Sequence, residues 1–189
     1  MNIANKLRKY DRTTTVFTIS DIKTILSIND SKTVYNALFY ATKRQELYKI
    51  SNGIYSYDQS YSRKELGNKL RTPSYISLYT VLQEEGVIFQ PYSSIFLIAN
   101  RSEKININGQ EYIYRKIKDG ILLNPLGIKE KEGTNIATKE RAICDKIYLD
   151  GLEYFDNTEN IDWNMMNQLN NEIYSNNSNI SKFISAYKK

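Results

Sequence analysis

The stretch Leu47-Tyr-Lys-Ile-Ser-Asn-Gly-Ile-Tyr-Ser-Tyr57 decides how the first third of this chain is interpreted. It contains two β-prone runs joined through Asn52-Gly53. Asn-Gly is the strongest short-range signal for a β-hairpin, because both central residues of a type I′ turn need positive φ. The stretch therefore predicts a hairpin that turns at Asn52-Gly53.

Three short helices are predicted upstream of this hairpin. The apolar residues of each have helical spacing. The first helix is predicted over 2–10, the second over 21–27 with Ser20 as its N-cap, and the third from an N-cap at Asp30 or Ser31 to about Gln45. In the third helix Val34, Ala37, Leu38 and Ala41 recur at i, i+3, i+4 and i+7, which predicts that they face the core. Helices joined by a tight polar turn and followed by a hairpin predict a winged helix-turn-helix over residues 1–60. A helix–hairpin unit with a purely structural role is the alternative.

The positive charge of the chain is concentrated in the same segment. The net charge is +5, and residues 1–57 contain nine basic side chains against four acidic ones, so this segment carries the whole surplus. This distribution is expected if only the N-terminal third meets a polyanion such as DNA. A solvated basic surface is the alternative.

Side chains that point away from the core on the third helix are candidates for contact with the major groove of double-stranded DNA. These outward positions are Lys32, Thr33, Asn36, Tyr40, Lys43 and Arg44. Asn36 has the amide that pairs bidentately with adenine, whereas the basic side chains suit guanine or phosphate. Further candidates for the minor groove and the backbone are Lys49, Ser51 and Asn52 on the hairpin and Lys6, Arg8 and Lys9 on the first helix. A solvated helix face is also polar, and this is the alternative.

The rest of the chain is predicted as a linker helix over 61–72 and a mixed α/β domain over 73–189, with a small antiparallel sheet and C-terminal helices. The predicted elements are a helix from Ser74 to Glu85, a buried strand over 94–99, a hairpin over 105–115 turning at Asn108-Gly109, a strand over 121–123, a helix capped by Thr138, and two helices over 163–173 and 180–187. The predicted fold class of the whole chain is α+β.

The composition argues against an enzyme. The chain has no histidine and one cysteine, Cys144, which removes Ser-His-Asp and Cys-His catalysis and the usual zinc sites. No metal site and no cofactor is predicted; a nuclease that holds magnesium with carboxylates is an alternative. Cys144 lies in an apolar-rich helix and is predicted to be a core residue. The sixteen tyrosines are spread along the chain, which favours packing over stacking on single-stranded nucleic acid.

The composition also bears on location. Hydrophobic residues make up 41% of the chain and charged residues 25%, which is typical of a globular protein. No apolar run approaches the roughly 18 residues that span a bilayer, and the N-terminal residues lack the apolar core of a secretory signal. We therefore expect a cytoplasmic protein that makes no contact with a membrane.

Several short motifs resemble the AbiE-type antitoxins of abortive-infection type IV toxin–antitoxin systems. In chain order they are Phe17-Thr-Ile-Ser-Asp-Ile22, Arg44-Gln-Glu-Leu47, Gly53-Ile54-Tyr55, the segment from Pro73 to Gly86, and Ile136-Ala-Thr-Lys-Glu-Arg-Ala-Ile-Cys-Asp145. The family often has proline after Ala-Thr, where this chain has Lys139. Each motif is short, and their common order carries the resemblance.

The resemblance implies a bifunctional protein of phage defence. The first domain would bind inverted repeats in its own promoter and repress transcription, and the second would counteract a co-encoded toxin of nucleotidyltransferase fold. Type IV systems neutralise without a stable toxin–antitoxin complex, so tight binding of the toxin is not expected. The alternative is a stand-alone winged-helix regulator or a protein-interaction module without antitoxin activity.

Overall fold

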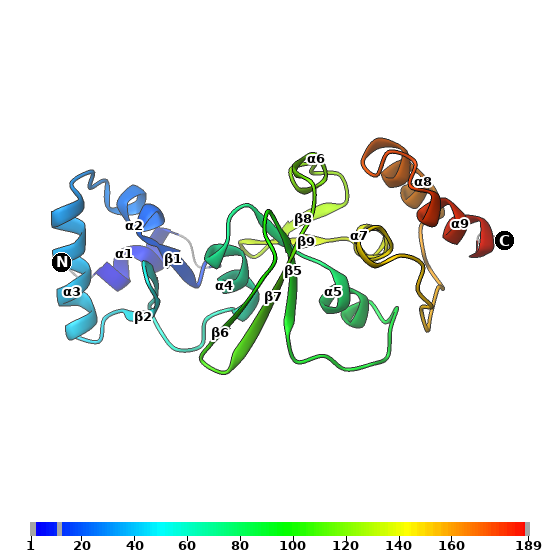
Figure 1. Ribbon diagram of the computed structural model, residues 1–189. Helices are drawn as coiled ribbons and strands as arrows, with labels where there is room; N and C mark the ends of the chain where they lie inside the picture. Colours follow the sequence, from blue (N-terminus) through cyan, green and yellow to red (C-terminus); the bar gives the residue numbers. More distant parts are fainter. Residues whose placement is uncertain (1–2, 11–12, 188–189) are drawn as a thin grey trace. The chain divides into compact units, whose positions relative to one another are not determined.

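The computed structural model describes residues 3–10 and 13–187. The chain divides into two compact units, residues 1–70 and 71–189. Each unit contains helices and strands (Figure 1), so the predicted α+β class is confirmed. No described helix combines the length and the apolarity that crossing a bilayer requires.

The first unit contains four helices and three strands among its described residues. They are α1 (Ile3–Tyr10), β1 (Val16–Thr18), α2 (Ile19–Leu26), α3 (Ser31–Lys43), β2 (Tyr48–Ser51), β3 (Ile54–Ser56) and α4 (Arg63–Leu70). The predicted hairpin is confirmed, but its turn differs from type I′: Gly53 has a φ of 73°, and Asn52 is not among the described residues with positive φ.

Helix α2 begins at Ile19 because Thr18, and not the predicted Ser20, is its N-cap. The Thr18 hydroxyl accepts a hydrogen bond from the Asp21 amide at 3.1 Å, and the Asp21 carboxylate accepts one from the Thr18 amide at 2.9 Å. This reciprocal pair satisfies two amides that the start of a helix leaves free. Helix α3 starts in a similar way, since the Asp30 carboxylate accepts from the Thr33 amide at 2.7 Å.

The three strands form an antiparallel sheet in the order β1-β3-β2. Strand β1 was not predicted, because it is only three residues long and is defined by its pairing with β3. The sheet closes a core to which all three helices α1 to α3 contribute, and which is formed by Ile3, Ala4, Leu7, Phe17, Ile22, Leu26, Val34, Leu38, Ala41, Leu47 and Tyr55.

Helix α4 coincides with the predicted linker helix, and it belongs to the first unit. Glu65 is fully buried, and its Oε2 accepts hydrogen bonds from the Thr15 amide at 2.8 Å and the Thr15 hydroxyl at 2.7 Å. Lys69 donates to Asp21 on α2 at 2.8 Å. These contacts fix α4 on α2 and on the segment that leads into β1.

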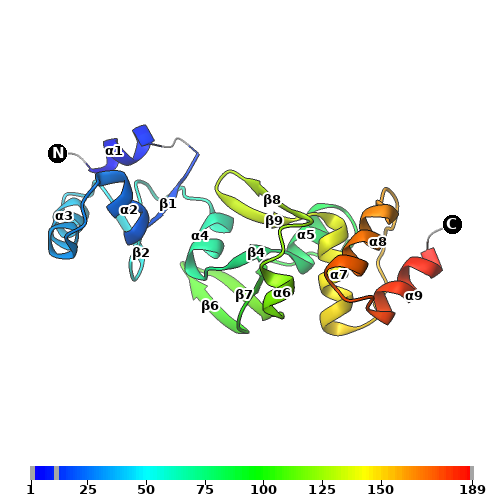
Figure 2. The same ribbon diagram turned by 90° about the horizontal axis from the view of Figure 1, so that it is seen from above.

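The second unit is built on a six-stranded mixed sheet in the order β6-β7-β5-β4-β9-β8, and not on the small antiparallel sheet that was predicted. Its elements are β4 (Ser74–Ile76), α5 (Leu78–Glu84), β5 (Ile95–Ala99), β6 (Glu103–Ile107), β7 (Gln110–Lys116), α6 (Asp119–Leu122), β8 (Ile128–Lys131), β9 (Thr134–Ala137), α7 (Lys139–Asp150), α8 (Trp163–Glu172) and α9 (Ser178–Tyr187). Helix α7 contacts α5, α8 and α9 (Figure 2).

Two further predictions in this unit are wrong. The helix predicted from Ser74 begins only at Leu78, because Ser74–Ile76 is a central strand that pairs with β5 on one side and β9 on the other. The strand predicted over 121–123 is instead helix α6, in which the Ile121 and Leu122 amides both donate to the Lys118 carbonyl at 2.9 Å. The predicted hairpin at Asn108-Gly109, the Thr138 cap and the two C-terminal helices are confirmed.

A buried polar cluster joins α7 to the sheet and to the end of α8. Asp145 accepts hydrogen bonds from Ser77 at 2.7 Å, Tyr174 at 2.7 Å and Tyr75 at 3.1 Å. Its other neighbour is Arg141 on the same helix, whose Nε lies 3.7 Å from the Asp145 carboxylate. Both charged side chains are fully buried, so each depends on its partners for the stabilisation that water would otherwise provide.

The Arg141 guanidinium also donates to two backbone carbonyls, those of Leu126 and Ile121, each at 2.7 Å. It thereby holds α6 and the loop before β8 against α7. Arg141 and Asp145 both belong to the motif Ile136–Asp145, so these two charged residues of the motif have a structural role in this chain.

Candidate nucleic-acid interface

Helix α3 has one buried side and one exposed side. Val34, Leu38 and Ala41 are buried in the core of the first unit, as the apolar spacing predicted, and Ala37 is half-buried against it. The six predicted contact residues of this helix are all exposed: Lys32, Thr33, Asn36, Tyr40, Lys43 and Arg44. Figures 1 and 2 show α3 at one edge of its unit, with α1 and α2 on one side of it. A long straight helix side is therefore open to a ligand.

The exposed side of α3 also carries two aromatic residues that were not among the predicted contacts, Tyr35 and Phe39. Tyr35 is 55% exposed and Phe39 is 62% exposed. Positions 32, 36, 39 and 43 follow one another at steps of four, three and four, so Phe39 lies on the same side as Lys32, Asn36 and Lys43. The helical periodicity alone was sufficient to place Phe39 there.

The charge of α3 is uniformly positive, since no acidic residue occurs between Ser31 and Lys43. Asp30 precedes the helix, and its carboxylate is occupied as the N-cap. Hydrogen bonds from Thr33 hold the pKa of Asp30 below its ordinary value, so Asp30 is ionised at neutral pH. The two lysines lie at opposite ends of the exposed side, which gives a polyanion one cationic contact at each end.

Arg44 differs from Lys43 in its surroundings. It follows the last residue of α3, and its Nε donates to the Glu46 carboxylate at 3.0 Å. This ion pair neutralises the arginine locally, although the side chain is 56% exposed. The structure therefore leaves Lys43 as the stronger cationic candidate of the two.

The hairpin residues occupy different environments. Lys49 and Asn52 are exposed, whereas Ser51 is half-buried. A hydrogen bond anchors the turn to the start of α2, since the Ile19 amide donates to the Gly53 carbonyl at 3.0 Å. Asn52 is consequently presented at a fixed tip, and Lys49 lies on the strand that leads to it.

The basic residues of α1 are exposed, but the described contacts do not join them to the outer side of α3. The Arg8 guanidinium lies over the Tyr57 ring, 4.8 Å from its centroid, and Tyr57 in turn packs against Phe17. Arg8 thus has a packing partner within the unit. Lys6 and Lys9 project into solvent.

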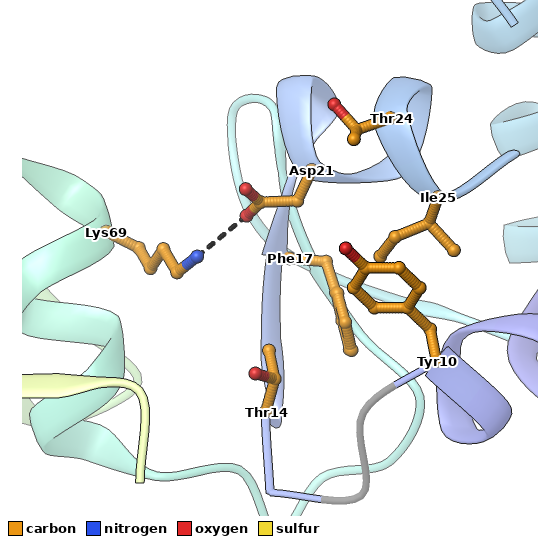
Figure 3. Close-up of a pocket in the computed structure, with 7 residues that line it drawn as sticks. All are labelled: Tyr10, Thr14, Phe17, Asp21, Thr24, Ile25 and Lys69. Carbon is orange, nitrogen blue, oxygen red and sulfur yellow. Dashed lines mark hydrogen bonds and ion pairs between the residues drawn. The ribbon is translucent and has the colours of Figure 1, made fainter. Parts of the chain in front are cut away.

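A separate pocket of about 210 Å³ lies in the first unit (Figure 3), and none of the candidate DNA-contact residues lines it. Its walls are formed by Tyr10, Thr14, Phe17, Asp21, Thr24, Ile25 and Lys69. The two charged residues are paired with each other. Burial disfavours ionisation of Asp21, but hydrogen bonds from Lys69 and Thr18 outweigh it, and the pKa of Asp21 is lowered.

Because the folded state lowers the pKa of Asp21, its carboxylate stabilises the fold above the unfolded pKa and loses this effect as the pH falls through the folded pKa. We expect Asp21→Asn to lower the free energy of unfolding by about 1 kcal/mol at pH 7, a value that allows for solvent screening of the partly exposed pair. The difference from the wild type should vanish at low pH. Urea unfolding followed by circular dichroism across this range measures it. An equal difference at all pH values would contradict the assignment.

The described residues contain no cluster of side chains suited to bind a metal ion. Cys144 is fully buried, which confirms the predicted core position, and burial raises the pKa of its thiol. A scan against protein-family models and a search of curated proteins returned no match to this chain.

Proposed function

We propose that the chain is a double-stranded-DNA-binding transcriptional regulator, whose first unit is a winged helix-turn-helix with α3 as its recognition helix. The observation that carries the proposal is the exposed side of α3, where Lys32, Asn36 and Lys43 share one side of a helix without acidic residues. The element order supports it, since the β2–β3 hairpin follows α3 directly, which is the order expected of a wing.

The dimensions of α3 suit the major groove. Lys32 and Lys43 are separated by eleven residues, which at the helical rise is about 16 Å along the axis. The major groove is about 12 Å wide and admits one α-helix, so the two ammonium groups are placed to reach phosphates on its two sides. Asn36 lies between them and presents its amide to the base edges, where asparagine pairs with adenine N6 and N7.

The resemblance to AbiE-type antitoxins extends the proposal to an autorepressor that binds inverted repeats in its own promoter. In this form, the second unit counteracts a co-encoded nucleotidyltransferase-like toxin without a stable complex. Expression of that toxin with and without the full chain tests this part. Restored growth would support antitoxin activity, and continued arrest at equal protein level would reduce the proposal to a regulator alone.

Two substitutions on α3 distinguish base contacts from phosphate contacts. Lys43→Ala is expected to weaken binding to all duplexes about equally and to reduce the slope of log affinity against log salt by about one. Asn36→Ala is expected to cost about 1–3 kcal/mol on the preferred duplex and to relax preference at one base pair. Selection from a randomised duplex library, followed by titration, measures both effects.

Lys182→Ala is the matched control, because Lys182 is an exposed lysine on α9 in the second unit. It should leave affinity and sequence preference unchanged. If Asn36→Ala retained the full preference of the wild type, α3 would not be the element that reads the bases.

A further inference from the structure

Three aromatic side chains form an exposed patch on α3 that the polar contacts above do not explain. Tyr35, Phe39 and Tyr40 are 55%, 62% and 56% exposed. The rings of Phe39 and Tyr40 contact edge to face, with centroids 5.4 Å apart. Large apolar groups are normally withdrawn from water, so a patch of this kind on a single helix indicates a surface that meets a ligand.

Phe39 lies at the centre of this patch and also at the centre of the proposed DNA-contacting side. Asn36 precedes it by three residues and Lys43 follows it by four, so both are its neighbours on the helix surface. Lys32 lies one further turn towards the N-terminus. Along the helix surface, the Phe39 ring therefore lies between the Asn36 amide and Lys32 on one side and Lys43 on the other.

This combination of side chains matches the chemistry of an A·T base pair in the major groove. Adenine presents N7 and N6 to a side-chain amide, and thymine presents its C5-methyl group, which is the apolar feature of that groove. Phenylalanine is one of the side chains that contact this methyl group. The flanking lysines favour a polyanion over an apolar protein surface as the occupant, because burying them against a protein would require acidic partners.

We infer that α3 recognises thymine-containing sites by contact of the Phe39 ring with a thymine C5-methyl group, next to the adenine that pairs with Asn36. This inference rests on the proposed function, and it names the base chemistry that the recognition helix selects. Tyr35 and Tyr40 flank Phe39 and exclude water from the contact.

Replacement of thymine by uracil tests the inference, since it removes the methyl group and leaves pairing and charge unchanged. A duplex is first selected from a randomised library with the full chain, and each thymine is then replaced by uracil in turn. For the wild type, at least one replacement is expected to weaken binding about fourfold, the factor that burial of one methyl-sized group provides. For Phe39→Ala, thymine and uracil duplexes are expected to bind equally.

Two further variants make the result specific. Phe89→Ala removes a phenylalanine that is 70% exposed in the second unit, and it should retain the fourfold discrimination of the wild type. Phe39→Leu keeps an apolar side chain and should retain part of it. The inference is overturned if the wild type selects a duplex but ignores the methyl group, or if Phe39→Ala still discriminates.

The outcomes also separate this inference from the proposed function. If the wild type enriches no duplex and binds none in a salt-dependent manner, the DNA-binding proposal fails and the inference fails with it. If Phe39→Ala changes the oligomeric state of the protein and leaves duplex affinity and methyl discrimination intact, the patch is a protein interface and only the inference is lost.

Discussion

Asp145→Ala is expected to lower the free energy of unfolding of the second unit by about 3–5 kcal/mol, the range found when one partner of a buried ion pair is removed. Both Asp145 and Arg141 are fully buried, so the substitution leaves an uncompensated guanidinium away from water. It also leaves the hydroxyl groups of Ser77 and Tyr174 without the acceptor that they share. The single tryptophan, Trp163, lies in this unit, and its fluorescence during urea unfolding reports the change.

Asp150→Ala is the matched control on the same helix. Asp150 pairs with Arg115 at 2.6 Å and with Lys146 at 3.1 Å, but its side chain is 30% exposed. Water compensates for the loss of such a pair, so the expected cost is about 1 kcal/mol or less. Equal costs for the two variants would contradict the structural role assigned to the buried cluster.

The second large effect concerns the salt dependence of DNA binding. Binding releases counterions from the DNA, so log affinity falls with log salt at a slope of about −0.9 per phosphate contact. If Lys32, Lys43 and Lys49 each neutralise one phosphate, raising monovalent salt from about 50 to about 200 mM should therefore weaken binding about fortyfold. Replacing all three lysines by alanine should remove most of this dependence. Fluorescence anisotropy with a labelled duplex measures the affinity at each salt concentration.

The control for this variant removes the same charge elsewhere. Lys104, Lys129 and Lys182 are exposed residues of the second unit, and their combined replacement by alanine should leave the salt slope unchanged. If both triple variants reduced the slope equally, binding would follow the net charge of the chain and not the α3 side and the hairpin.

The elements that were predicted correctly have strong local signals. The two hairpins at Asn-Gly, the Thr138 cap and the helical spacing of Val34, Leu38 and Ala41 each depend on residues close in the chain. Strands β1 and β4 are three residues long, and their structure is set by partners distant in sequence. In the β8–β9 hairpin, three of the four β8 residues are exposed, so the alternating apolar pattern of a strand is absent.

The candidate interface shows the same distinction. Helical periodicity was sufficient to predict that Lys32, Asn36 and Lys43 are exposed together. It did not predict that Arg44 pairs with Glu46 or that Arg8 stacks on Tyr57, since both contacts depend on the folded geometry. Phe39 was not among the predicted contact residues, although its helical spacing from Asn36 and Lys43 is sufficient to place it on the exposed side, where it is found.

The most direct test of the central claim is a titration of the full chain with the DNA upstream of its own gene and with a scrambled duplex of the same composition, at physiological salt. If α3 reads base edges in the major groove, the upstream DNA should bind about a thousandfold more tightly or better, as specific sites do relative to non-specific DNA. Equal affinity for the two duplexes would contradict the assignment of this protein as a sequence-specific regulator of its own promoter.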